Sequence, residues 1–409
     1  MTLNQTGGGE LGRGVTARTI HVHRPDKPND TDTFANIIAF NITRESRAKA
    51  PLPWEIYTLA KRSDLSVKKV VVKTVAEKKR IAGIFTNAHA RNFVAKDFST
   101  KEAFKEELAN MRIFKSVSPA ELEKATTILT PEYNSQEGIL AIVFPEHSGW
   151  FIFSERCDQQ VSDMAFSSDA DMDKFVRQIL ENFSFIHRHG MLHGDVKMTN
   201  MMYNTDKGRF KLIDWGKSAD EKEMVARYVT GKRFVKVNNS SSPMAWMCAG
   251  LNYSASLVFM VYVVTRHMEK IAMCPAMRSL VSHAYASFGA AMHERFGGSP
   301  LLHMDKVLSQ SVRREILREH MYSFDLYDLA LIFTSITCTY QGALSKQRCK
   351  RVEGLSKGLV GYGDGAAHIP SADAAIEWWN AHSNAGKTVK VASTKSAATK
   401  PKSTKAAKR

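Results

Sequence analysis

The pattern of hydrophobic and polar positions changes character at about residue 157 of the 409-residue chain. Before that point, four short runs rich in β-branched and aromatic residues predict strands, namely 54–62, 67–75, 138–145 and 150–157. A short polar link joins the first two runs, which therefore predict a hairpin. One helix is predicted in this part, over 100–117, because apolar residues recur there every three to four positions.

Beyond residue 157 the periodicity is mainly helical. Over 169–190, Phe175, Ile179 and Phe183 share one helical face, and acidic residues occupy the first turn. Short strands are predicted around "NMMYN" and "RFKLID", and the remainder has helical patterning. A strand-rich part with one helix, followed by a helix-rich part, predicts an α+β fold with two lobes.

Composition predicts four segments. Residues 1–50 are rich in glycine and turn-forming residues, which predicts a flexible N-terminal extension. The β-rich lobe is expected over 51–157 and the helical lobe over 158–384, with an atypical segment after Asp214. Residues 385–409 are mostly Lys, Ala, Ser and Thr, so they bury too little apolar surface to fold and predict a disordered tail.

The positive charge is concentrated at the C-terminus. The chain has a formal net charge of +16, and the basic tail contains eight Lys or Arg residues and no acid. Its charged residues, from Lys387 to Arg409, are spaced like those of linker-histone tails and predict nucleic-acid binding that weakens with salt. A solubilising tail or a nuclear-import signal fits the same composition.

Cysteine usage and apolar runs bear on the compartment. Five cysteines are scattered without a C-x-x-C pair, which favours reduced thiols over a disulfide framework. The N-terminus lacks a secretory pattern, and the apolar run 257–264 is too short to span a bilayer. We therefore expect an intracellular protein, cytoplasmic or nuclear, without a membrane partner.

Two short motifs carry residue types suited to phosphoryl transfer. "HGDVKMTN" (193–200) contains an acid, a lysine and an amide, and "IDWGK" (213–217) follows it with a second acid. Phosphoryl transfer requires a lysine on the nucleotide phosphates, groups that hold metal ions, and a carboxylate that orients the attacking hydroxyl. The two motifs supply most of these groups in sequence order.

The stretch from about residue 54 to 264 resembles a Ser/Thr protein kinase. By this resemblance Asp195 is the base for a protein hydroxyl, and Lys197 reaches the γ-phosphate of ATP. Asn200 and Asp214 hold Mg²⁺, with Mn²⁺ as an alternative, and Lys73 in "KKVVVKTV" binds the α/β-phosphates. Casein kinase II also has a "VVVK" strand, a "DVK" loop and a D-W-G turn.

Three features depart from the kinase pattern. The place before Lys73 where a Gly-rich loop belongs, "RAKAPLPWEIY", contains no glycine, and "GGGELG" (7–12) is interpreted as part of the flexible terminus. Glu106 is expected to pair with Lys73, with Glu107 beside it. Gly194 stands where kinases often place Arg, which predicts activity independent of activation-loop phosphorylation.

Three alternatives remain open at the level of sequence. The central helix of the second lobe is either "NYSASLVFMVYV" or "SFDLYDLALIF". The chain is either an active kinase or a pseudokinase scaffold with a nucleic-acid-binding tail. H-G-D with I-D-W-G also resembles aminoglycoside-type phosphotransferases, although Lys197 favours the protein kinase, because those enzymes usually have His at that position.

Overall fold

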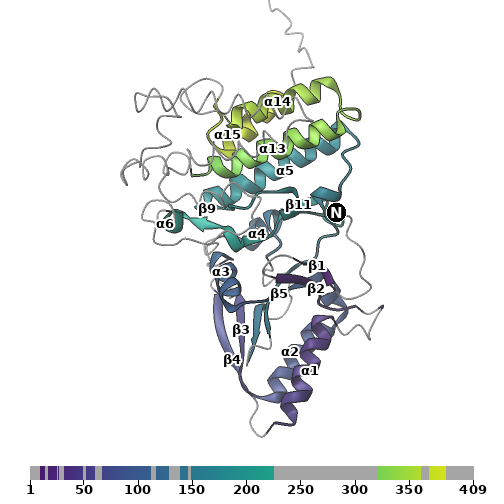
Figure 1. Cartoon of the computed structure of the whole chain (residues 1–409), viewed down its shortest axis with the longest axis vertical. Helices are drawn as coiled ribbons and strands as arrows, with labels where there is room; N and C mark the ends of the chain where they lie inside the picture. Colours follow the sequence, from purple (N-terminus) through teal and green to yellow (C-terminus); the bar gives the residue numbers. More distant parts are fainter. Residues whose placement is uncertain are drawn as a thin grey trace, which may run out of the picture.

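The chain folds into a strand-rich half and a helical half, which lie at opposite ends of the molecule (Figure 1). The computed structural model describes residues 10–13, 17–24, 26, 32–48, 52–59, 67–111, 117–128, 139–145, 149–224, 321–360 and 368–383. The α+β, two-lobed prediction is confirmed. The basic tail and most of the atypical segment after Asp214 lie outside the described residues.

A seven-stranded antiparallel sheet forms the first half. In spatial order its strands are β1 (Glu10–Arg13), β2 (Ala17–His21), β5 (Phe93–Phe98), β7 (Gly149–Glu155), β6 (Ile139–Phe144), β3 (Trp54–Leu59) and β4 (Val67–Val72). The predicted hairpin is β3 and β4, with Trp54 opposite Val72. Because β4 is an edge strand, four of its six residues are exposed.

Helices cover both faces of this sheet. On one face, α1 (Phe34–Ser46) and α2 (Val75–Thr86) pack Phe34 and Phe85 against the aromatic residues of the strands. On the other face, α3 (Lys101–Met111) buries Phe104 and Leu108. A 3-10 helix, η1 (Ala88–Asn92), precedes β5.

The expectation that residues 1–50 form a flexible extension is wrong for the described residues of that range. β2 pairs with β5 along its whole length, and α1 contributes fully buried side chains to the core. The turn-forming residues of this range predicted a flexible segment, but strand pairing orders β2 and helix packing orders α1.

A buried ion pair joins the two helices that cover the sheet. The ammonium of Lys78 on α2 contacts the Glu45 carboxylate on α1 and donates to Leu52 O at 2.6 Å. Trp54 Nε1 donates to the other Glu45 oxygen at 2.7 Å. Lys78 is fully buried, so its charge depends on these partners.

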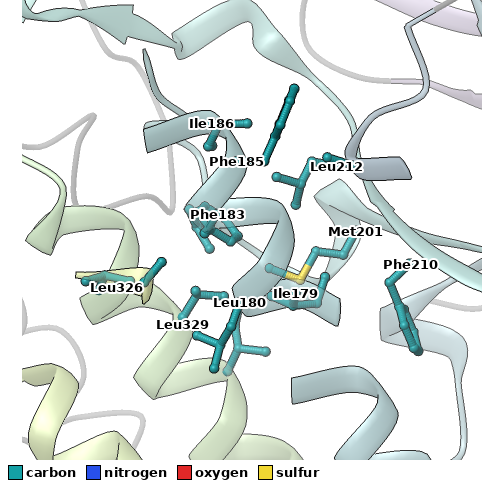
Figure 2. Packing of buried hydrophobic residues seen from close by; sticks show 14 of the residues in the cluster. Ile179, Leu180, Phe183, Phe185, Ile186, Met201, Phe210, Leu212, Leu326 and Leu329 are labelled. Carbon is teal, nitrogen blue, oxygen red and sulfur yellow. The ribbon is translucent and has the colours of Figure 1, made fainter. Parts of the chain in front are cut away.

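The second half is built around α5 (Asp169–Arg188). Ser168 caps it by accepting from Asp171 N, and Asp169 and Asp171 lie in its first turn, where the helix dipole favours negative charge. Leu180 and Phe183 lie on the side of Leu326 and Leu329 of α13, whereas Ile179 lies beside Met201 (Figure 2). The other helices are α4 (Pro119–Ala125), α6 (Glu221–Met224), α13 (Ser323–Tyr340), α14 (Lys346–Val360) and α15 (Ala372–Ala381).

Short strands and 3-10 turns connect the two halves. They are β8 (Gln159–Gln160), η2 (Val161–Asp163), β9 (Met191–Leu192), η3 (Met198–Asn200), β10 (Met201–Asn204), β11 (Arg209–Leu212), η4 (Trp215–Lys217) and β12 (Ala219–Asp220). β8, β10 and β11 form one small sheet, and β9 pairs with β12. The predicted strands around "NMMYN" and "RFKLID" are therefore confirmed as β10 and β11.

The cysteines and the apolar helices bear on two further expectations. Cys338 is disulfide-bonded, contrary to the expectation that all thiols are reduced, whereas Cys157 and Cys349 are free. No helix within the described ranges is both long and apolar enough to cross a membrane.

Candidate functional site

The segment "HGDVKMTN" forms a loop between β9 and β10 that is fixed at both ends. β9 pairs with β12 at its beginning, and Ile213 N donates to Asn200 O at 3.0 Å at its end. His193 is buried, and its Nε2 lies 3.0 Å from Ile213 O. Ile213 and β12, which lie on either side of Asp214 in the sequence, therefore hold the loop in position.

Asp195 is at the centre of this loop and is 3% exposed. Its Oδ2 accepts from Lys197 Nζ at 2.8 Å and from Asn200 Nδ2 at 3.0 Å. Its Oδ1 has no hydrogen bond within the described part of the chain; Lys217 Nζ lies 3.7 Å from it. A buried carboxylate oxygen without a donor is costly, so this atom is suited to accept from a bound hydroxyl.

Asp325 on α13 anchors the first residues of the loop through hydrogen bonds to their backbone. Its Oδ2 accepts from His193 N at 2.8 Å and its Oδ1 from Gly194 N at 3.0 Å, while His187 Nε2 lies 3.0 Å from Oδ2. Asp325 is fully buried. The "SFDLYDLALIF" segment is therefore the central helix of this half, and "NYSASLVFMVYV" lies outside the described residues.

A second acid lies one turn further along α13. Burial, with smaller contributions from the charges of Asp325 and Asp195, raises the pKa of Asp328 well above its ordinary value. Asp328 is 4% exposed, so burial favours the neutral form of the acid beneath the loop.

Lys96 on β5 connects the two halves at the site. Its Nζ donates to Glu107 Oε2 on α3 at 2.5 Å and to Asp214 Oδ1 at 2.9 Å. The assignments of Lys73 and Glu106 are therefore wrong. Lys73 is exposed after the edge strand β4, and Glu106 is on the exposed face of α3.

Lys96 favours the ionised forms of both carboxylates, but burial, together with the charge of Asp214, leaves the pKa of Glu107 raised. Burial lowers the pKa of Lys96, but the carboxylates of Glu107 and Asp214 outweigh it, and the net pKa is raised above the ordinary lysine value. Burial likewise raises the pKa of Asp214, but Lys96 more than compensates and lowers it to about 2. Lys96 and Asp214 therefore remain charged at neutral pH.

The backbone at Asp214 is strained. Its φ of 67° makes it the only non-glycine residue with a positive φ within the described ranges. Such conformations persist where surrounding contacts impose them, often at functional sites. Here Asn110 Nδ2 on α3 donates to Trp215 O at 2.6 Å, and Trp215 packs against His193.

The strand hairpin β1–β2 lies next to Lys96. Gly12 on β1 is opposite Thr19 on β2, and Thr19 is opposite Lys96 on β5. The interpretation of residues 7–12 as a flexible terminus is therefore wrong for Gly12. Gly12 and Arg13 are the last two residues of this strand, and residues 14–16 lie outside the described ranges.

Asn200 and Asp214 offer oxygen ligands of the kind that Mg²⁺ prefers. The Asn200 amide nitrogen is engaged with Asp195, which leaves its oxygen available, and Asp214 has one oxygen beyond its bond to Lys96. No group of three or more His, Cys, Asp or Glu suited to a metal occurs among the described residues. A metal here would take its remaining ligands from phosphate and water.

The chain is similar to protein kinases over its central part. A family model described as "Protein kinase domain" matches residues 88–238. A probable casein kinase II subunit alpha homolog of Encephalitozoon cuniculi is 41% identical over 46 residues, which is 11% of this chain and 14% of that protein.

Two further curated proteins match similarly short stretches. Serine/threonine-protein kinase Kist of Homo sapiens is 36% identical over 53 residues, or 13% of each chain. Serine/threonine-protein kinase pim-2 of Danio rerio is 31% identical over 74 residues, or 18% of this chain and 22% of that protein. The chain thus matches less than a quarter of the length of each of these relatives.

Proposed function

We propose that the chain is an ATP-dependent Ser/Thr protein kinase, on the basis of its similarity to the protein kinase domain over residues 88–238. The observation that carries the proposal is the buried Asp195, whose Oδ1 has no hydrogen bond within the described part of the chain and whose Oδ2 is held by Lys197 and Asn200. A carboxylate fixed in this way can accept the proton of a substrate hydroxyl.

Lys197 and Lys96 are proposed to bind the phosphates. Lys197 Nζ is 2.8 Å from Asp195 Oδ2, so it can contact the γ-phosphoryl oxygens while the hydroxyl approaches the acid. Lys96 replaces Lys73 in the role of α/β-phosphate ligand, positioned by Glu107. The hairpin containing Gly12 is proposed to cover the phosphates, since glycine lets backbone N–H groups approach them.

Asn200 and Asp214 are proposed to hold the divalent metal, Mg²⁺ or Mn²⁺. When bound, the metal would neutralise charge on the phosphoryl oxygens. The residues of this chain fix the two ligands: Asp195 O and Oδ2 accept from the Asn200 amide, and Lys96 fixes the Asp214 carboxylate.

The loop geometry supports phosphorylation-independent activity. Gly194 has a φ of 74°, a region that glycine adopts without cost, and its N–H donates to Asp325. The loop is thus fixed by α13, and the chain has no arginine at 194 to link it to a phosphate. We expect phosphatase treatment to leave the transfer activity in place.

The test is transfer of labelled phosphate from ATP, with Mg²⁺ or Mn²⁺, to casein, histone and the protein itself. Asp195→Asn should lower transfer by about 10²- to 10⁴-fold, because it removes the base. Asp206→Asn, an exposed acid in the turn between β10 and β11, is the matched control and should retain full activity. Equal activity of wild type and Asp195→Asn would refute the assignment.

A pseudokinase scaffold is the second candidate, and the eight basic residues of the tail support it. In that case the main function would be nucleic-acid binding through Lys387–Arg409. Folded wild type that transfers no label to any acceptor, yet binds nucleic acid only with its tail, would favour this candidate.

A further inference from the structure

A cavity apart from the candidate site lies at the edge of the sheet where β2 and β7 end and β5 begins. Its volume is about 330 Å³, and it is lined by His21, His23, Arg24, Asp26, Arg91 and Arg156. None of these residues belongs to the candidate site around Asp195 and Lys96. The lining is almost entirely cationic or titratable, and it contains one carboxylate.

The sheet brings these residues together from three parts of the sequence. His21 is opposite Val94 on β5, and Val22 N donates to Phe93 O at 3.4 Å, which places Arg24 beyond the end of β2. On the other side, Arg156 N donates to Asn92 O at 2.8 Å. Arg91, one residue earlier in η1, therefore lies between the two flanking segments.

Of the three arginines that line this cavity, only Arg24 forms an ion pair with another described residue. Arg24 Nη2 pairs with Asp26 Oδ2 at 3.2 Å. Neither Arg91 nor Arg156 forms an ion pair with a described residue, and both are exposed. Like charges held this close repel one another, so an anion that enters the cavity would relieve the repulsion.

We propose that this cavity binds a phosphorylated serine or threonine side chain of a protein. A phosphate monoester carries nearly two negative charges at neutral pH and presents three oxygens, which match several converging guanidinium forks. The cavity is large enough for one such side chain. Nucleic acid, with one charge per phosphate along an extended backbone, fits an extended basic stripe better than a single half-open cavity of this size.

The binding test uses a short peptide with one phosphoserine, its unphosphorylated counterpart and inorganic phosphate, measured by calorimetry on the full chain. Lys96→Met is included because the candidate active site also attracts phosphate. We expect the phosphopeptide to bind wild type and Lys96→Met alike, and the unphosphorylated peptide to bind neither. Arg91→Ala with Arg156→Ala should weaken binding by at least about tenfold.

Two single variants sharpen the assignment. Arg80→Ala removes an exposed guanidinium on α2, outside the cavity, and should leave binding unchanged. Asp26→Asn should strengthen binding, because it removes the carboxylate that competes for Arg24. A general electrostatic attraction would respond to Arg80→Ala as strongly as to the cavity variants.

Three results would overturn the proposal. One is loss of binding in Lys96→Met with retention in the Arg91/Arg156 double variant, which would place the phosphopeptide at the candidate active site. Another is tighter binding of a single-stranded DNA oligonucleotide that depends on the same arginines, which would make the cavity part of a nucleic-acid surface. The third is that folded wild type does not bind the phosphopeptide at millimolar concentration.

Discussion

Replacing Asp325 is the sharpest test of how the fold positions the candidate catalytic loop. This fully buried carboxylate accepts from His193 N and Gly194 N and contacts His187 Nε2. Hydrogen bonds to a charged group contribute about 1.5–3 kcal/mol each, and a buried donor left unsatisfied costs about 1–3 kcal/mol. Part of this is offset, because the variant no longer desolvates a carboxylate.

We therefore expect Asp325→Ala to lower the free energy of unfolding by about 3–5 kcal/mol, the usual cost of breaking a buried polar network on one side. Urea denaturation followed by circular dichroism measures this. Asp206→Ala is the matched control: Asp206 is an exposed carboxylate in the turn between β10 and β11, so its loss should cost less than about 1 kcal/mol.

Asp325→Asn separates stability from function. The amide keeps the shape, but it can accept at only one oxygen, so one backbone N–H of the loop loses its partner. Under conditions where this variant is folded, we expect phosphate transfer to fall by about 10²-fold, because small displacements of reacting groups are costly. Wild-type stability in Asp325→Ala, or wild-type transfer in Asp325→Asn, would show that α13 does not hold the loop.

Three further predictions concern other parts of the chain. Lys78→Ala should destabilise by about 3–5 kcal/mol in urea, since it leaves the Glu45 charge buried without its partner, whereas exposed Lys79→Ala should have little effect. Asp328→Asn should be more stable than wild type at pH 7. Because the folded-state pKa is raised, the unfolded chain releases this proton above about pH 4 while the folded protein still holds it, so wild-type stability falls as the pH rises above about 4 and the variant's should not; identical pH profiles would contradict this. Deleting 385–409 should abolish the salt-sensitive part of DNA binding in a fluorescence-anisotropy titration, and an unchanged salt slope would exclude the tail as the binding element.

The sequence identifies the candidate loop and the proposed metal ligands because they are short motifs with fixed spacing. "HGDVKMTN" and "IDWGK" each lie between short strands. In the structure, Lys197 and Lys217 contact Asp195, and Lys96 contacts Asp214. Their order and spacing along the chain are sufficient to identify them, although long-range contacts from Asp325 and Lys96 hold them in position.

The phosphate-binding lysine is different, because two strands offer the same local pattern. "VVVK" on β4 and "VAK" on β5 both end in lysine and both precede a helix. Only strand pairing separates them: β4 is an edge strand, whereas β5 lies between β2 and β7. A pairing between distant segments cannot be read from the local sequence.

The helix glutamate could have been assigned from periodicity. Phe104, Leu108 and Met111 form the buried face of α3, and Glu107 lies on that face, three residues after Phe104 and four before Met111. Glu106 lies on the exposed face. The hairpin that contains Gly12 was harder to recognise. Gly12 comes near Lys96 only because β1 pairs with β2 and β2 pairs with β5, and its position in the sequence is far from Lys73.

The most direct test of the account compares phosphate transfer from labelled ATP by wild type, Lys96→Met and Lys73→Met. Both variants remove one ammonium, but only Lys96 contacts Glu107 and Asp214. The account predicts that Lys96→Met lowers transfer by about 10²-fold or more and that Lys73→Met retains wild-type activity. Loss of activity in Lys73→Met with retention in Lys96→Met, or no transfer by folded wild type, would contradict it.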